Sequence, residues 1–101
     1  MSEATIVDMN SHGTGLARQV CDMDEHGGMK ADALKIGTEA VEKYREEKDI
    51  AGHVKRSFDA KYGPTWFVIA GSDFKAHCTH EAKTFFFFYV GKIAICMYKA
   101  R

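Results

Sequence analysis

The feature that most constrains the fold is a run of five aromatic residues, Phe85-Phe86-Phe87-Phe88-Tyr89. Side chains alternate between the two faces of a strand, so a strand that is apolar at every position needs both of its faces covered. Two helices can cover one face of a small sheet, but a chain of 101 residues has little left to cover the other. A second copy of the protein is the simplest cover. The aromatic run therefore predicts an obligate oligomer.

Length and composition exclude several classes of protein. A chain of this size is expected to form a single domain. Its 14 basic and 14 acidic residues cancel, so neither nucleic acid nor an anionic membrane is favoured as a partner. No apolar run is long enough to cross a bilayer, and residues 1–15 lack the pattern of a signal peptide. Three scattered cysteines favour a reducing intracellular compartment.

The first fifteen residues show little hydrophobic periodicity and contain several glycine and polar residues. We interpret residues 1–15 as a disordered N-terminal arm, with a docking tail as the functional alternative. The folded domain is then expected over residues 16–101.

Two amphipathic helices are predicted in the first half of the chain. The first begins near Met29 and contains Gly37, which costs about 1 kcal/mol relative to alanine and suggests close packing against a neighbouring element. The second follows Asp49, a suitable N-cap, and ends at Gly63-Pro64. The apolar stripes consist of Ala33, Leu34, Gly37, Ala40, Val41 and Tyr44 in the first helix, and of Ile50, Val54, Phe58 and Tyr62 in the second.

The second half of the chain has the composition of β-strands. Gly91 marks a tight hairpin between the last two predicted strands. The order β-α-α-β-β-β-β predicts an α+β domain, an antiparallel sheet with two helices on one face. The expected strands cover residues 16–21, 65–70, 74–79, 84–90 and 92–98.

Only one group of residues could suggest metal or thiol chemistry, and it is weak. His77, Cys78 and His80 lie close together, but Cys78 would point away from His77 in a strand, and no second ligand pair is present. A nucleophilic Cys78 would need an orienting third group, and His80-Glu81 lacks the second histidine of a zinc-protease helix. We therefore predict no catalytic residue, no metal and no cofactor. A small metal- or thiol-dependent enzyme remains the alternative of another class.

The predicted strand 74–79 is less apolar than its neighbours and lies between two turns. Such a strand is a candidate sheet edge, with free backbone donors and acceptors. An edge beside an aromatic surface can take up an extended peptide as an additional strand. The residues alone leave open whether this is a peptide-binding edge or simply a polar one.

Short segments spread over the chain are specific as a set, although each is weak alone. They are Glu42-Lys43-Tyr44, Glu47-Lys48-Asp49-Ile50-Ala51, His53, Phe58-Asp59, Lys61-Tyr62, Pro64-Thr65-Trp66, Phe74, Thr79-His80-Glu81, Lys83, Phe85, Tyr89, Gly91 and Ala94-Ile95. With this set the chain resembles the small dynein light chains of the homodimeric hub type, over residues 29–99.

The resemblance implies a strand-swapped dimer in which two sheets pack face to face with the helix pairs outside. One strand, here residues 74–79, pairs with the partner's sheet, and its free side receives an extended segment of a target. The implied function is a non-catalytic hub without a cofactor. It binds dynein intermediate chains or other disordered proteins and supports dynein assembly and microtubule-based movement. The dimer would be homotypic or formed with a related light chain, in the cytoplasm or in a ciliary or flagellar axoneme.

The resemblance also assigns roles to residues by position. By strand alternation, Phe85, Phe87 and Tyr89 share one face, with Phe86 and Phe88 on the other. The implied peptide-binding residues are Lys48, Phe74, Lys75, Ala76, His77, Cys78, Thr79, Phe85, Phe87, Tyr89 and Ala94. The implied dimer interface contains Phe67, Phe74, His77, Thr79 and His80.

Five departures from the family pattern bear on specificity. Phe67 stands where members usually carry an interface histidine whose protonation splits the dimer, so we predict a dimer that tolerates mild acid. Ala31 replaces a glutamine that helps to recognise the target, Lys75 a glycine and His77 a tyrosine. Ala100 replaces a C-terminal serine proposed as a phosphorylation site. Ala31, Lys75 and His77 favour one alternative within the family, a fixed structural subunit of an axonemal dynein arm.

Overall fold

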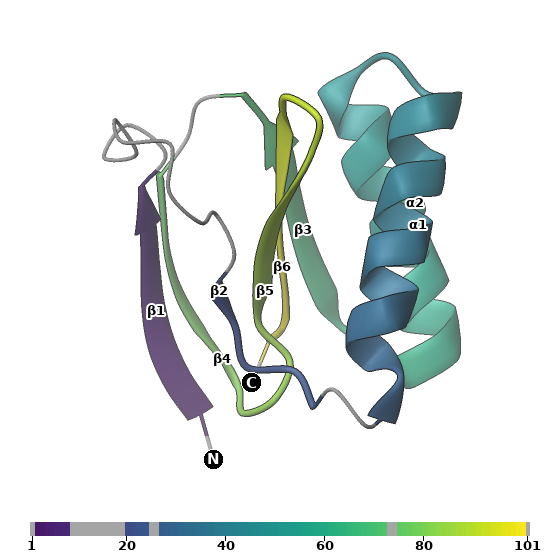
Figure 1. The fold of residues 1–101 in the computed structure, drawn as a ribbon. Helices are drawn as coiled ribbons and strands as arrows, with labels where there is room; N and C mark the ends of the chain where they lie inside the picture. Colours follow the sequence, from purple (N-terminus) through teal and green to yellow (C-terminus); the bar gives the residue numbers. More distant parts are fainter. Residues whose placement is uncertain (1, 9–19, 25–26, 73–74, 101) are drawn as a thin grey trace.

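The structure is a computed structural model that describes residues 2–8, 20–24, 27–72 and 75–100, with side chains placed over residues 21–24, 27–72 and 80–100. It confirms the predicted α+β fold, with an additional strand at the start (Figure 1). The elements are β1 (Ser2–Asp8), β2 (Val20–Cys21), α1 (Met29–Lys43), α2 (Glu47–Tyr62), β3 (Trp66–Gly71), β4 (Lys75–Glu81), β5 (Phe86–Val90) and β6 (Ile93–Lys99). Neither helix has the length and hydrophobicity of a membrane span.

Helices α1 and α2 cover one face of a four-stranded sheet (Figure 1). Their buried residues recur at steps of three and four, which places them on one side of each helix. The predicted stripes are confirmed except at Leu34, which is 36% exposed. The buried positions are Ala33, Gly37 and Ala40 in α1, and Ile50, Val54 and Phe58 in α2.

Only the C-terminal end of α2 matches the prediction. Gly63 follows the helix with a φ of 81°, a conformation that glycine adopts without strain. Asp49, the predicted N-cap, instead lies inside the first turn, and Glu46 takes the N-cap position without a side-chain hydrogen bond. The helix begins earlier because the backbone N–H groups of Asp49 and Ile50 both donate to the Glu46 carbonyl.

Gly37 allows α1 to approach the sheet closely. A Cβ at this position would lie 2.9 Å from Cε2 and Cζ of Phe88 and 3.2 Å from Cδ1 of Ile95. Both neighbours are fully buried, so neither has room to move away. The predicted close approach is confirmed.

The sheet has the strand order β2-β5-β6-β3, with every neighbouring pair antiparallel. β5 and β6 form the predicted hairpin around Gly91, whose φ is 61°. Phe86 and Phe88 join the core beneath the helices, and Phe85 and Phe87 belong to a separate cluster. The predicted alternation of the aromatic run is therefore confirmed.

A two-stranded sheet of β1 and β4 forms a third layer, on the side of the main sheet away from the helices (Figure 1). Residues Phe85 to Phe88 are at most 1% exposed within this single chain. Burial of these four phenylalanines therefore needs no second copy, and the aromatic run does not by itself require an oligomer.

Residues 2–8 form a strand where the sequence analysis expected part of a disordered arm. Thr5, Ile6 and Val7 are consecutive β-branched residues, which favour extended backbone when a partner strand is available. Residues 9–15 of the expected arm lie outside the described residues. So do residues 16–19 of the expected first strand, of which Val20–Cys21 is seen as β2.

Candidate functional site

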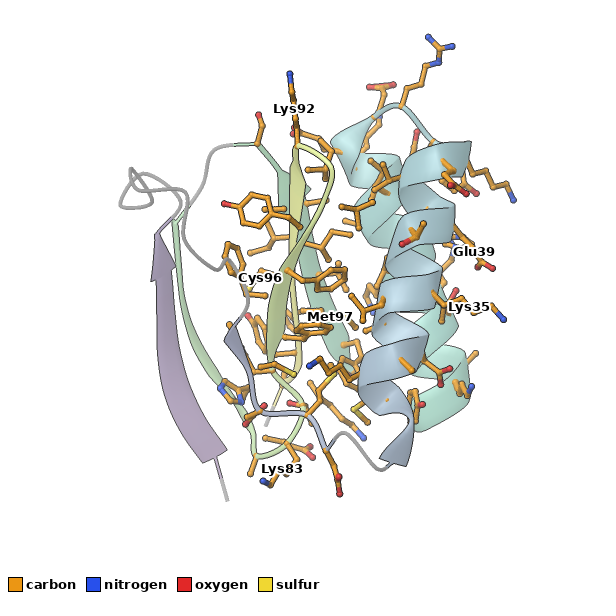
Figure 2. All side chains as sticks on the ribbon, in the orientation of Figure 1. Lys35, Glu39, Lys83, Lys92, Cys96 and Met97 are labelled. Carbon is orange, nitrogen blue, oxygen red and sulfur yellow. The ribbon has the colours of Figure 1, made fainter. Side chains whose placement is uncertain are left out.

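The face of the main sheet that points away from the helices carries a compact group of side chains. We call it the distal face cluster: Phe85, Phe87, Ala94 and Cys96, with Tyr89 and Tyr98 packed against them. The register of the β5–β6 hairpin produces it, since Phe87 is paired with Cys96 and Tyr89 with Ala94. Figure 2 shows the alternation on β6, with Cys96 directed away from the helices and Met97 towards them.

Ring packing orders the cluster. The rings of Phe87 and Tyr89 meet edge to face, with centroids 5.6 Å apart, and Phe85 stacks on Tyr98 at 6.3 Å. His80, at the end of β4, is 1% exposed and its ring centroid lies 4.9 Å from that of Phe85. Its Nδ1 lies 2.9 Å from the carbonyl oxygen of Glu81, to which an N–H at that atom can donate. One end of β4 is thus fixed against the cluster.

On the same face of the main sheet, away from the helices, the side chains of β3 are exposed to solvent. Phe67 is 48% exposed and Ile69 39% exposed, and their register partners on β6 are Tyr98 and Cys96. Within the described residues β3 pairs only with β6, so its other edge has free backbone groups. Phe67 and Ile69 therefore form an apolar surface beside an unpaired strand edge.

The turn between β4 and β5 is held by side chains from distant parts of the chain. Asp22 accepts hydrogen bonds from the backbone N–H groups of Lys83, at 3.0 Å, and Phe85, at 2.7 Å. The Thr84 hydroxyl donates to the Glu81 carbonyl at 2.7 Å and accepts from the backbone N–H of Lys99 at 3.2 Å. These bonds hold the turn through which the chain passes from β4 into β5 of the main sheet.

A charged network joins the two helices, on the other side of the main sheet. The carboxylate of Asp32 in α1 accepts a hydrogen bond from the Tyr62 hydroxyl and lies 2.6 Å from Nζ of Lys61, both in α2. The hydrogen bond from Lys61 is the main cause that lowers the pKa of Asp32. This network stabilises the helix pair and lies away from the distal face cluster.

Comparison with known sequences decides the family. Residues 17–100 match the profile of the family described as dynein light chain type 1. The chain belongs to that family.

A solved structure agrees with the fold. It is the dynein light chain-like domain of a calcium-binding protein from Fasciola hepatica, with a TM-score of 0.60 and 22% sequence identity. The match covers 94% of this light chain and 98% of the other chain. At that identity the likeness concerns the fold alone.

The light chain brings together some of the residues predicted to bind peptide. Phe85, Phe87, Tyr89 and Ala94 lie together in the distal face cluster. Lys48 is exposed in the first turn of α2 and belongs to the helix layer. Phe74 lies outside the described residues, while Lys75, Ala76, His77, Cys78 and Thr79 are placed in β4 by their backbone only.

The residues predicted at the dimer interface occupy two separate places. Phe67 is exposed on β3, whereas His80 is buried against Phe85. His77 and Thr79 lie in β4. Over the part of the chain that was searched, no three His, Cys, Asp or Glu side chains gather as a possible metal site.

Three residues that build the distal face cluster or hold the neighbouring β4–β5 turn were not singled out from the sequence. Tyr98 and Cys96 follow Ala94 at steps of two, so strand alternation was the signal that could have found them. Asp22 had no such signal, because its partner Phe85 is 63 residues away.

Proposed function

We propose that this light chain is a non-catalytic dimeric hub. It holds extended segments of dynein intermediate chains, or of other partner proteins, and so supports dynein assembly and microtubule-based movement at the cytoskeleton. The chemistry is β-strand addition to β4, which requires neither a catalytic group nor a cofactor.

The observation that carries the proposal is the pairing of β4 with a second strand over its whole length. All seven residues of β4 have partners in β1, from Lys75 opposite Asp8 to Glu81 opposite Ser2. The backbone of β4 is therefore extended and regular enough to accept an added strand. The distal face cluster supplies apolar and aromatic groups next to its His80 end.

The open side of β3 supports the dimer. An apolar surface beside an unpaired edge suits the β4 strand of a second copy, which would pair with β3 and cover Phe67 and Ile69. Two such grooves in one dimer make the second binding event effectively intramolecular, which raises avidity by about 10²–10⁴-fold.

A titration tests both parts. Peptides from the disordered region of a dynein intermediate chain are added to the purified protein while light scattering follows mass and calorimetry follows binding. We expect two peptides per dimer. Phe67→Asp should yield a monomer, whereas Leu34→Asp, a matched exposed apolar position on α1, should leave the dimer intact. A wild-type monomer that binds no peptide would refute the proposal.

The fixed axonemal subunit is the second candidate function, favoured by Ala31, Lys75 and His77, which depart from the family pattern. A panel of unrelated target peptides separates the two functions. Binding of a single intermediate-chain segment and no other peptide supports the fixed subunit, and binding of several supports the hub.

A further inference from the structure

The chain's own strand β1 lies on an edge of the strand that the proposed function requires. Glu3 pairs with His80 on one side, and Ala100 forms an isolated bridge with the same residue. A strand residue has one neighbour on each edge, so β1 and Ala100 mark opposite edges of β4. In the proposed dimer one of these edges goes to the partner's sheet and the other to the target segment.

We propose that residues 2–8 are a built-in competitor, an intramolecular strand that occupies the target-binding edge of β4 until a partner protein displaces it. This inference rests on the proposed strand-addition function. While β1 is paired, all seven residues of β4 already have a partner along that edge. A segment that binds at this edge therefore has to displace β1.

The composition of β1 suits this role. Its centre, Thr5-Ile6-Val7, consists of β-branched residues that favour extended backbone. At one end of the ladder, Asp8 lies opposite Lys75. Opposite charges at directly opposed positions favour an antiparallel pair. Lys75 departs from the family pattern, and its register partner is an acidic residue of the chain's own N-terminal strand.

Tethering makes such a strand effective even when its intrinsic affinity is low. A ligand on a short flexible linker acts at an effective concentration of about millimolar. The apparent affinity for an added segment is then the intrinsic affinity multiplied by the fraction of molecules whose edge is free. If β1 is paired in nine-tenths of the molecules or more, the affinity falls about tenfold or more.

The test uses the full chain and a labelled peptide, SEATIVD, that copies residues 2–8. The variant Thr5→Pro/Ile6→Pro removes two successive backbone N–H groups. Successive N–H groups of a strand point to opposite edges, so one of the two faces β4 and its hydrogen bond is lost. Ser11→Pro/His12→Pro, in the connecting segment, is the control. We expect the peptide to bind the first variant at least about tenfold more tightly than the wild type or the control. Equal binding by all three proteins, or none by the variant, would overturn the inference.

Hydrogen exchange of the wild type gives a second measurement that needs no variant. Amides of residues 2–8 should lose protection when excess SEATIVD peptide is added, and unchanged protection would contradict the proposal. Without peptide, the protection should not depend on protein concentration. Protection that rises with concentration would mean that the strand comes from another copy, and would refute an intramolecular competitor.

An intermediate-chain peptide separates this inference from the proposed function. If it binds the wild type and the Thr5→Pro/Ile6→Pro variant equally, the hub stands and the competitor is excluded. If SEATIVD binds the variant tightly and the intermediate-chain peptide binds neither protein, the competitor stands and the hub fails.

Discussion

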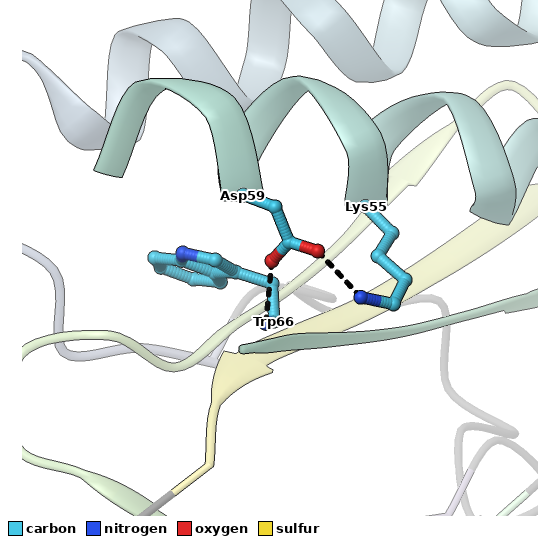
Figure 3. A network of polar contacts seen from close by, with 3 residues as sticks. All are labelled: Lys55, Asp59 and Trp66. Carbon is cyan, nitrogen blue, oxygen red and sulfur yellow. Dashed lines mark hydrogen bonds and ion pairs between the residues drawn. The ribbon is translucent and has the colours of Figure 1, made fainter. Parts of the chain in front are cut away.

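The carboxylate of Asp59 accepts a hydrogen bond from the backbone N–H of Trp66 at 2.8 Å (Figure 3). Asp59 lies in the last turns of α2 and Trp66 is the first residue of β3. The second carboxylate oxygen of Asp59 lies 2.5 Å from Nζ of Lys55, one helical turn earlier. A single carboxylate thus joins the helix layer to the edge strand that carries Phe67.

The Asp59 contact predicts loss of stability in acid. The hydrogen bond from Lys55 lowers the pKa of Asp59 below 3.8, with the Trp66 N–H adding to it and burial opposing it. Because the pKa is lower in the folded state, the stabilisation is present above the unfolded value and is lost as pH falls through the folded one. The free energy of unfolding should therefore fall as the pH drops below about 5.

Denaturant unfolding across that range is the measurement, and Asp59→Asn should show a shallower pH dependence. Glu39→Gln, at an exposed position of α1, is the control that should follow the wild type. A slope in Asp59→Asn as steep as in the wild type would rule out this carboxylate as a source of the acid sensitivity.

Tyr62 predicts a change at the alkaline end. Burial, followed by the hydrogen bond to Asp32, raises the pKa of Tyr62 to about 12. A raised folded-state pKa contributes stability that is complete below the ordinary tyrosine pKa of 10.0 and is lost as pH rises through about 12. Stability should fall over this window in the wild type and less in Tyr62→Phe. The difference in tyrosinate absorbance between the wild type and Tyr62→Phe isolates this one residue. It should titrate near pH 12. A titration near pH 10 would contradict the assignment.

Gly37→Ala should destabilise the protein although alanine favours helices. The added methyl would meet Phe88 at 2.9 Å inside a packed core, and overpacking of this kind costs about 1–3 kcal/mol. The gain in helix propensity is about 1 kcal/mol, so we expect a net loss on the order of 1 kcal/mol. Thermal or denaturant unfolding measures it.

Gly52→Ala in α2 is the matched control. Its Cβ would meet only the end of the flexible Arg56 side chain, which can move into solvent. This variant should gain up to about 1 kcal/mol. Equal effects of the two substitutions would show that contact with Phe88 does not determine the result at Gly37.

Phe67→His should make the proposed dimer sensitive to acid. Phenylalanine does not titrate, whereas an exposed histidine becomes charged near pH 6.5 and would place like charges across the interface. Sedimentation should show the wild type as a dimer at mild acid and Phe67→His dissociating as pH falls through about 6. Phe67→Tyr keeps the ring and is the control. Dissociation of the wild type near pH 6 would point to His77 or His80 instead.

The sequence predicted the features that depend on local period and turn chemistry. The alternation of Phe85 and Phe87 against Phe86 and Phe88 follows from a repeat of two, and Gly63 follows from the conformation that a helix end requires. These signals lie within a few residues of the feature they specify. They are independent of how the rest of the chain is arranged.

The sequence did not predict the features that depend on distant partners. Residues 2–8 are a strand because β4, about seventy residues later, is available to pair with them. The burial of Phe87 within one chain likewise depends on how the layers stack, which no local pattern encodes. The start of α2 before Asp49 is an error of boundary, where competing caps differ by little free energy.

The strand order β2-β5-β6-β3 has a consequence for synthesis of the protein. β6 is the last described strand in the chain, yet it lies in the middle of the main sheet between β5 and β3. On the ribosome, the helices and β3 emerge with no strand to complete their core. The main sheet can close only after Lys99 has been added, so folding must occur late and nearly all at once.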